Sequence, residues 1–345
     1  MQLLRLKIEK LRSIQHLELD LSVAPDSPRR RLVLLGANGA GKSTVLDAVA
    51  YVFQAIGSDT KDLGAAELTA GDVRSVGEPR LGADAPPPRG LIELQAVLSP
   101  EERRGIASYY PAAPPSGEVR LTVGGGLLSW TMRLLTAGNV NPGRNAFEDA
   151  AHAALVEAKP PCVLLPADRG VLEPRENLML RDVTDFNPRH FALSRSRERF
   201  SSLSARLALA YAGDKRLDPS QAVSRMWKVL EKYFPELPRP VGIEGLSLRF
   251  LTRDGATVGL GALSEGQRAL LLVFGEIALR APQHGVVLID EVEQHLHPRW
   301  QRIIPEALTA LVPTAQFILT TQSPYLAASV PDDRLELGSW RDEGE

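Results

Sequence analysis

The feature that most constrains the fold is a glycine-rich stretch, GANGAGKST, at residues 36–44. It follows a short apolar run, RLVLLG, that is typical of a buried strand, and it precedes apolar residues at helical spacing. A G-x-x-x-x-G-K-[ST] loop between a strand and a helix predicts a phosphate-binding site, because its backbone N–H groups and the helix N-terminus attract phosphate. The alternative, a glycine-rich turn with a chance lysine, leaves both flanking elements unexplained.

The same loop supplies candidate ligands for a nucleotide and its metal ion. Lys42 can reach the β and γ phosphates, and the Ser43 hydroxyl can bind Mg²⁺. The residues that we expect to bind ATP here are Asn38, Gly39, Ala40, Gly41, Lys42, Ser43 and Thr44.

A second element, VVLIDE at residues 286–291, is an apolar strand that ends in two carboxylates. We expect Asp290 to bind Mg²⁺ through water and Glu291 to polarise the attacking water. Alone, such a strand is often one that runs into a solvated loop. Its pairing with the phosphate loop favours the catalytic interpretation.

Composition excludes several other classes of protein. With 345 residues, 44% hydrophobic and 24% charged, the chain is typical of a globular protein of one large or two modest domains. The formal net charge of −2 means that any contact with nucleic acid or membrane must come from a local patch. The single cysteine excludes a disulfide framework. No signal peptide or membrane span is evident, so we expect a cytoplasmic protein without membrane contact.

Apolar periodicity is clearest at the two ends of the chain. Residues 2–21 contain two alternating stretches that predict an antiparallel pair of strands. The C-terminal part alternates strands with helices, which predicts a parallel sheet with helices packed on it. The expected strands there are 246–252, 286–290 and 315–320, and the expected helices are 264–281, 298–312 and a short one after Ser323. Between the ends we expect a loop over 57–90, strands at 91–98, 118–123 and 127–135, and helices at 142–158 and 190–234.

Four motifs in order, GANGAGKST, LSEGQ, VVLIDE and TTQSP, resemble those of ABC-type ATPase heads, whose signature is commonly Leu-Ser-Gly-Gly-Gln. Ser264, Gly266 and Gln267 match that signature, and Glu265 replaces a glycine. The stretches LKIEKLRSIQHLELDL and DEVEQHLHPRWQ resemble the SMC/RecF/OLD-related heads of DNA repair and phage defence. The resemblance covers roughly residues 1–56 and 260–330.

This resemblance implies an α/β P-loop NTPase fold, with a mixed sheet and an inserted α-rich lobe. The ATPase lobe would comprise residues 1–56, with the phosphate loop, and 241–345, with the other motifs; the inserted lobe would be 57–240. It also implies Mg-ATP as ligand and a homodimer, or higher oligomer, around two nucleotides. Ser264 and the start of its helix would then contact the γ-phosphate bound by a second copy.

Two departures from the family pattern bear on catalysis. Gln322 stands where the family has a switch histidine; it can donate an amide N–H but cannot carry a proton, so we expect slow or partner-dependent hydrolysis. The alternative is that Gln322 merely caps a strand end. The family's metal-binding glutamine is missing from VLLPADRG, residues 163–170, and Asp168, Gln54 and Gln95 are its candidate replacements.

Three further features are open to two interpretations each. Arg12 resembles a nucleotide-proximal arginine of these heads, or it is a solvated surface arginine. HLHP, residues 295–298, is a metal pair or, as the resemblance favours, a turn that faces the dimer partner. Residues 181–216 hold eight Lys or Arg against four Asp or Glu, and form a solvated helix face or a contact for nucleic acid or an acidic partner.

Three functions are compatible with these observations. The first is the ATPase subunit of a prokaryotic defence or toxin system that controls a separate effector, such as a nuclease or toxin. We expect the effector on another polypeptide, since about 20 residues follow the last motif. The second is a RecF-like DNA-repair clamp that binds duplex DNA directly. The third is a largely non-hydrolysing scaffold, suggested by Gln322.

Overall fold

The fold is described from a computed structural model. The described residues are 1–24, 27–57, 91–109, 118–124, 130–134, 161–172, 193, 200–213, 220–280 and 282–338. The expected loop over 57–90 and the expected helix at 142–158 lie almost entirely outside them. Within the described residues, no helix is both long and apolar enough to cross a membrane.

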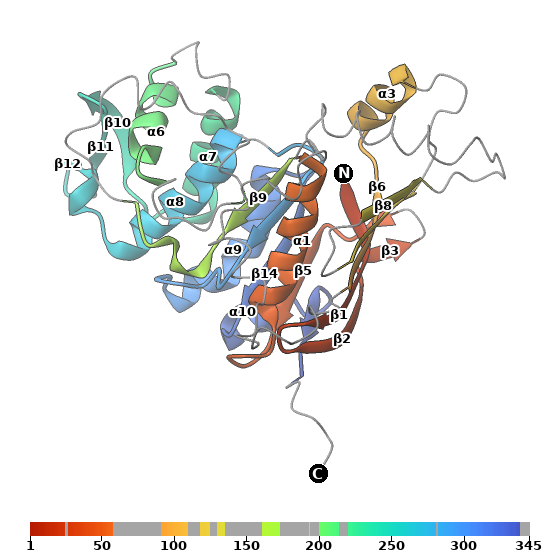
Figure 1. The fold of residues 1–345 in the computed structure, drawn as a ribbon. Coiled ribbons are helices and arrows are strands. Elements are labelled where there is room, and N and C mark those ends of the chain that lie inside the picture. The colour runs from red at the N-terminus through yellow and green to blue at the C-terminus, as the bar shows by residue number, and fades with distance from the viewer. Residues whose placement is uncertain are drawn as a thin grey trace, which may run out of the picture.

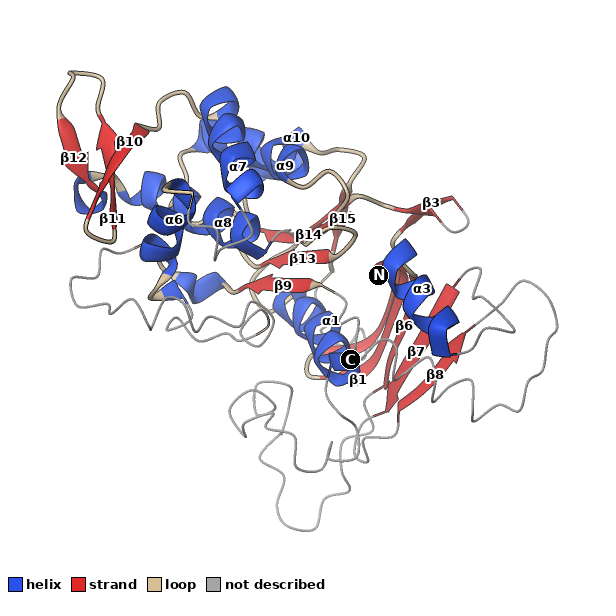
Figure 2. Ribbon diagram, turned by 90° about the horizontal axis from the view of Figure 1, so that it is seen from above, coloured by secondary structure: helices blue, strands red, loops and turns tan. Residues whose placement is uncertain are grey.

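A five-stranded parallel sheet forms the centre of the molecule (Figures 1 and 2). Its strand order is β15-β5-β14-β13-β9, and all four neighbouring pairs run parallel. The strands are β15 (Arg334–Glu336), β5 (Arg31–Leu35), β14 (Gln316–Thr321), β13 (Val286–Ile289) and β9 (Cys162–Leu165). Residues from both ends and the middle of the chain therefore build one sheet.

Both faces of the centre of the parallel sheet are covered, which is why β9, β13 and the middle of β14 are continuous apolar runs rather than alternating ones. Val286 and Leu288 of β13 belong to a core shared with helix α1 (Lys42–Gly57) and the N-terminal strands. Val287 and Ile289 belong to a second core with helices α8 (Glu265–Arg280) and α9 (Pro298–Leu311). Figure 2 shows α1 and these two helices on opposite sides of the sheet.

A second, antiparallel sheet is built on the N-terminal strands, in the order β2-β1-β6-β7-β8. The expected antiparallel pair at the N-terminus is confirmed. The strands are β2 (Ile14–Asp20), β1 (Gln2–Leu11), β6 (Leu91–Val97), β7 (Glu118–Gly124) and β8 (Trp130–Leu134). The last three belong to the range 57–240, yet they extend the sheet of β1, because β6 pairs with β1 from Gln2 to Glu9. Beside this sheet lie α3 (Pro100–Tyr109) and the short pair β3 (Ser22–Ala24) and β4 (Ser27–Pro28).

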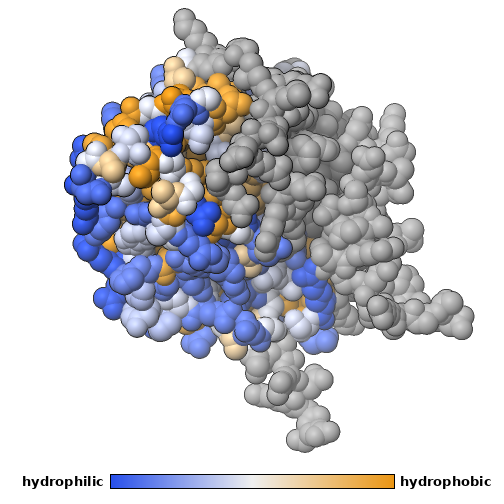
Figure 3. Space-filling model, turned by 90° about the vertical axis from the view of Figure 1, so that its left-hand side faces the viewer, coloured by the Kyte–Doolittle hydropathy of each residue, from blue (hydrophilic) through white to orange (hydrophobic). Residues whose placement is uncertain are grey.

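A mostly helical lobe packs on the α8 side of the parallel sheet (Figure 1). It contains α6 (Leu203–Tyr211), α7 (Ser220–Tyr233) and a small sheet of β10 (Arg239–Glu244), β11 (Ser247–Leu251) and β12 (Thr257–Gly259). Figure 3 views this side, where hydrophilic surface is interrupted by apolar patches. Three exposed apolar side chains of the small sheet are Val241, Ile243 and Leu251.

The C-terminal elements follow the sequence prediction closely. Helices α8 and α9 begin and end within one residue of the predicted ranges, and β11, β13 and β14 lie at the three predicted strands. The short helix α10 (Pro324–Ser329) begins after Ser323, whose hydroxyl accepts from the N–H groups of Tyr325 and Leu326. A side chain that accepts from these first-turn N–H groups is the expected N-cap.

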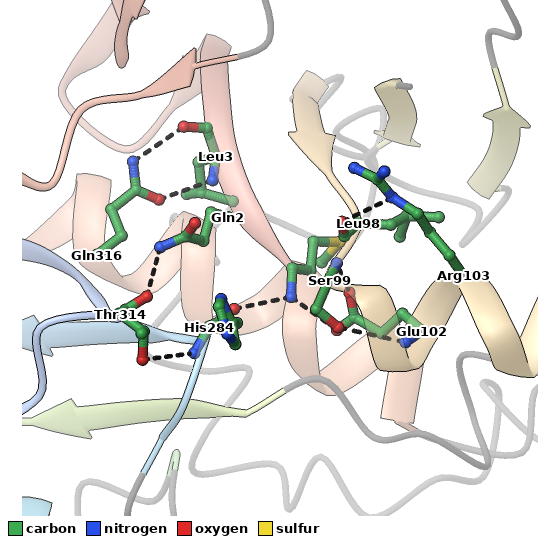
Figure 4. A network of polar contacts seen from close by, with 10 residues as sticks. Gln2, Leu3, Leu98, Ser99, Glu102, Arg103, His284, Thr314 and Gln316 are labelled. Carbon is green, nitrogen blue, oxygen red and sulfur yellow. Dashed lines mark hydrogen bonds and ion pairs between the residues drawn. The ribbon is translucent and has the colours of Figure 1, made fainter. Parts of the chain in front are cut away.

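A buried glutamine fastens the two large sheets to each other (Figure 4). Gln316, at the start of β14, is 1% exposed. Its Oε1 accepts from the N–H of Leu3 at 2.7 Å, and its Nε2 donates to the Leu3 carbonyl at 2.9 Å and to the Arg29 carbonyl at 3.0 Å. Nearby, Gln2 donates to the Thr314 carbonyl at 2.9 Å. These bonds set the position of β1 relative to the parallel sheet.

We expect Gln316→Leu to lower the free energy of unfolding by about 3 kcal/mol, because the buried N–H and C=O of Leu3 lose their partners. Urea denaturation followed by circular dichroism measures this change. The control is Gln283→Leu, at an exposed glutamine that accepts one bond from Thr314, with an expected change within about 0.5 kcal/mol. Equal losses in the two variants would contradict the role assigned to Gln316.

Candidate functional site

The motifs predicted from sequence meet at one edge of the parallel sheet. Parallel strands end at the same edge, so the segments that follow them lie beside one another. The phosphate loop follows β5, Gln322 follows β14, and Asp290 follows β13. Because β14 pairs with both β5 and β13, Gln322 lies between the other two groups.

The phosphate loop has the backbone that its glycines permit. Gly39 and Gly41 have φ values of 81° and 83°, in the left-handed region that favours glycine. The Lys42 side chain turns back over the loop, and its Nζ donates to the carbonyls of Gly36 at 2.6 Å and Ala37 at 2.9 Å. The loop is thus already curved around the lysine ammonium group, a shape suited to holding an anion.

Asp290 is held by the strand next to it. Its side chain is almost fully buried, and its Oδ1 accepts from the Thr320 hydroxyl at 2.7 Å. The same hydroxyl oxygen accepts from the backbone N–H of Glu291 at 2.8 Å. Thr320 therefore fixes the first carboxylate and the start of the turn that carries the second. Thr320 had no role in the sequence prediction, although it is the first residue of the TTQSP motif, which was a usable signal.

Gln322 joins the phosphate loop to the second carboxylate. Its Nε2 donates to Asn38 Oδ1 at 2.7 Å and to Glu291 Oε1 at 2.9 Å. Its backbone N–H donates to Glu293 Oε1 at 2.7 Å. A side chain that only capped a strand end would not make these two contacts. The amide instead connects the candidate nucleotide loop with the candidate base.

Glu291 occupies a constrained turn. Its φ of 46° is left-handed, which is uncommon for a residue with a side chain. Gln294 Nε2 donates to Glu291 Oε2 at 3.0 Å, so each carboxylate oxygen accepts from a glutamine amide. The carboxylate is therefore oriented by hydrogen bonds that do not depend on a protonated partner.

Arg169, which the sequence did not single out, stabilises the turn of Asp290 and Glu291. It follows β9, the neighbour of β13, and is 3% exposed. Its Nη1 donates to the Asp290 carbonyl at 2.6 Å, and its Nη2 donates to the Glu291 carbonyl at 3.0 Å. Burial lowers its pKa to about 10, and the negative charges of Asp290, Glu293 and Glu291 oppose that shift. The guanidinium is a fixed positive charge beneath the carboxylates.

Arg12 lies beside the first turns of α1. Its Nη1 donates to Asp47 Oδ2 at 2.7 Å and to the Thr44 hydroxyl at 3.4 Å. Of its two interpretations, this geometry favours the nucleotide-proximal one over a solvated surface arginine. Direct contact with a nucleotide stays a prediction.

The signature residues Ser264, Gly266 and Gln267 make their contacts with each other and with the HLHP turn. Ser264 and Gln267 form a reciprocal cap, in which Ser264 N–H donates to Gln267 Oε1 at 2.9 Å and Gln267 N–H donates to the Ser264 hydroxyl at 3.3 Å. Gly266 lies against the turn that contains HLHP, because a Cβ at that position would be 2.7 Å from the His295 carbonyl oxygen. Helix α8 is on the opposite face of the parallel sheet from α1 (Figure 2). Within one copy of the chain, the signature therefore does not reach the phosphate loop at the start of α1.

The candidates for the missing metal-binding glutamine are less well supported. Asp168 is exposed in the 3₁₀ turn Ala167–Arg169 after β9, beside the cluster. Gln95 lies opposite Arg5 in the antiparallel sheet, and the side chain of Gln54 is outside the described part. Of the two candidates whose side chains the structure describes, Asp168 is therefore the better placed.

The HLHP turn and the described part of the basic segment 181–216 make structural contacts. In the described ranges there is no group of three or more His, Cys, Asp or Glu that could hold a metal ion. His297 instead caps α9 by accepting from the Arg299 N–H at 3.2 Å. Most of the basic segment 181–216 lies outside the described residues. Its Arg206 is buried and pairs with Glu276 at 3.4 Å, so it is not available to a phosphate backbone.

Comparisons with solved structures agree with this architecture. The structure described as the SmcHead bound to the C-winged helix domain of ScpA matches with a TM-score of 0.53 and 18% identity, over 95% of this chain and 92% of that one. An Smc head domain from Pyrococcus furiosus matches with a TM-score of 0.52 and 15% identity, over 98% and 94%. The fold is therefore that of a P-loop NTPase of the α/β class, like the SMC heads, as the sequence predicted.

Family models narrow this further. A model described as "AAA domain, putative AbiEii toxin, Type IV TA system" matches residues 152–328, and one described as "AAA domain" matches residues 5–81. The chain belongs to the first of these families.

Two curated relatives share parts of the sequence. The Retron Vc95 probable ATPase of Vibrio cholerae serotype O1 biovar El Tor is 33% identical over 96 residues, which are 25% of this chain and 19% of that protein. The Septu protein PtuA of Bacillus mycoides (strain KBAB4) is 22% identical over 334 residues, 93% of this chain and 38% of that protein. The chain thus spans well under half the length of both relatives.

We expect Arg169→Leu to lower the free energy of unfolding by about 3 kcal/mol, since it leaves buried carbonyls of the turn unpaired and removes the charge beneath three carboxylates. Urea denaturation measures the change. The matched control is Arg249→Leu, which removes an exposed ion pair with Glu244 and should cost less than about 1 kcal/mol. A small loss for Arg169→Leu would refute the supporting role.

Proposed function

We propose that this protein binds and hydrolyses Mg-ATP, forms a head-to-head dimer around two nucleotides, and uses that dimer to control a separate effector in a prokaryotic defence or toxin system. The observation that carries the proposal is the Gln322 amide, which bonds to both Asn38 and Glu291. A nucleotide on the phosphate loop would lie beside the same amide. Hydrolysis of that nucleotide would therefore act directly on the position of the Glu291 carboxylate, the proposed base.

The chain's own residues suit the binding of a nucleoside triphosphate. The curved loop with Lys42 at its centre would hold the phosphates by backbone N–H groups and one ammonium group. Ser43 and Asp290 supply oxygen ligands, the kind that Mg²⁺ prefers, and Asp290 is already fixed by Thr320. Mg²⁺ would supply neutralisation of phosphate charge.

Glu291 is the proposed base. Its carboxylate would accept hydrogen bonds from the attacking water and polarise it, while Gln322 and Gln294 keep its two oxygens in place. Gln322 can donate to a phosphate oxygen or to water, but it cannot take up a proton. Hydrolysis should therefore be slow, or should depend on a partner that completes the site.

The dimer and the effector are inferred from the signature and from the relatives. Gly266 lies against the HLHP turn, and Ser264 and Gln267 bond to each other at the start of α8, contacts that support a role toward a second copy. The sequence similarity to a retron ATPase and to a Septu protein supports a place in a multi-protein defence system. We propose a cytoplasmic location, where ATP is available.

We expect Glu291→Gln to bind ATP but hydrolyse it at least about 100 times more slowly, because the base is lost while the phosphate loop is intact. The variant should accumulate as an ATP-dependent dimer, measured by size-exclusion chromatography with light scattering. Lys42→Ala is the control, and it should bind no ATP and stay monomeric. Wild-type turnover in Glu291→Gln would refute the assignment of the base.

The trapped Glu291→Gln dimer also tests the effector. Expressed with its neighbouring genes and purified in ATP, it should carry a stoichiometric second protein that mass spectrometry identifies as a nuclease, toxin or similar enzyme. Lys42→Ala, purified alongside, should carry much less of it. Nucleic acid alone, without a protein partner, would instead favour the repair clamp.

We expect Gln322→His to change how hydrolysis depends on pH. Glutamine does not titrate, so residue 322 contributes no step to the wild-type profile. Histidine ionises at a pKa of about 6.5, and the new variant should therefore show a change in kcat between about pH 5.5 and 7.5. Superimposable profiles for the two proteins would show that residue 322 does not reach the reacting groups.

A further inference from the structure

Glu265 places a carboxylate where the signature of the related heads has a glycine. It is the first residue of α8, and its side chain is 61% exposed. A carboxylate at a helix N-terminus interacts favourably with the unpaired N–H groups there, and so competes with any phosphate that approaches the same helix end. If a second copy's γ-phosphate binds at α8, this negative charge must be compensated.

His295 supplies a partner for that carboxylate. Its Nδ1 lies 3.1 Å from Glu265 Oε1, and its side chain is 34% exposed. Arg299, four residues further on, pairs instead with Glu236 at 2.8 Å. The imidazole is thus the group of the HLHP turn that faces Glu265.

The backbone holds His295 in this position. Its φ is 61°, in the left-handed region, and its carbonyl oxygen lies so close to Gly266 that a Cβ there would approach to 2.7 Å. Any side chain at position 266 would therefore push the turn away from α8. The glycine of the signature and the left-handed histidine together bring the imidazole against the carboxylate.

The same turn begins at the proposed base. Gln294 N–H donates to the Glu291 carbonyl at 3.0 Å, and Leu296 N–H donates to the Glu293 carbonyl at 3.0 Å. A short hydrogen-bonded segment thus connects Glu291, in the chain's own site, with His295, at the helix offered to a second copy.

We propose that His295 is a positioning residue that holds the Glu265 carboxylate toward the HLHP turn and so leaves the N–H groups at the start of α8 that the Ser264 cap does not use available to a phosphate bound by a second copy. This inference rests on the proposed function, because it assumes the ATP-dependent dimer. It assigns to the histidine a role toward the partner's nucleotide, separate from catalysis at the chain's own phosphate loop.

The test is a double-mutant cycle in the Glu291→Gln chain, with the dissociation constant of the ATP-dependent dimer measured by sedimentation velocity. His295→Gly is used because glycine adopts a φ of 61° without strain. It should weaken the dimer about fivefold, as expected when the Glu265 carboxylate is free to turn back to the helix N-terminus and compete with the phosphate there. Glu265→Gln should not weaken the dimer. In the Glu265→Gln background, His295→Gly should then change the constant by less than about twofold, since no charge remains to be held.

The cycle separates electrostatic positioning from a purely structural role. If His295 only shapes the turn, His295→Gly weakens the dimer equally in both backgrounds, and the inference is wrong. A matched control is His16→Ala, which removes an exposed histidine 3.7 Å from Glu9 on the antiparallel sheet and should leave the dimer unchanged. If the Glu291→Gln chain itself forms no dimer in ATP, the proposed function fails, and the inference fails with it.

Discussion

The parallel pairing of β14 with β5 on one side and β13 on the other decides where every catalytic candidate lies. It places the end of β14 between the phosphate loop and the Asp-Glu turn. Gln322 and Thr320 then reach their neighbours without any long loop, at distances between 2.7 and 2.9 Å. A sheet buried on both faces makes this register hard to change, because a slip would misplace apolar residues on both sides.

The buried guanidinium of Arg169 stabilises this edge of the sheet. Burying such a charge costs stability unless its N–H groups are hydrogen-bonded. Arg169 donates to three carbonyl oxygens, of Pro166, Asp290 and Glu291, and lies beneath acidic side chains. Its lowered pKa records the desolvation of the guanidinium. The protein tolerates that cost at a position where the charge can hold the backbone carbonyls of Asp290 and Glu291.

Sequence patterns located some elements well and missed others for physical reasons. Helices α8 and α9 were predicted to within a residue, since a long apolar face gives a strong periodic signal. Strand β9 is as short as β13, at four residues, but it lacks the Asp-Glu end that marked β13 in the sequence, so its place in the sheet was not foreseen. Helix α3 was not predicted either, although the sequence carries a local signal for its start, the Ser99–Glu102 capping box. Both hydrogen bonds of that box are present in the structure.

The sequence by itself determined the identity of the candidate site groups: a phosphate loop, two carboxylates at a strand end, and a glutamine in place of a histidine. Local spacing encodes these because each motif is contiguous. Only the tertiary structure decided which groups touch. The bonds of Gln322 to Asn38 and Glu291, and the pairing of Glu265 with His295, join residues about 30 to 280 positions apart. Such contacts depend on strand order and helix packing, which no local pattern specifies.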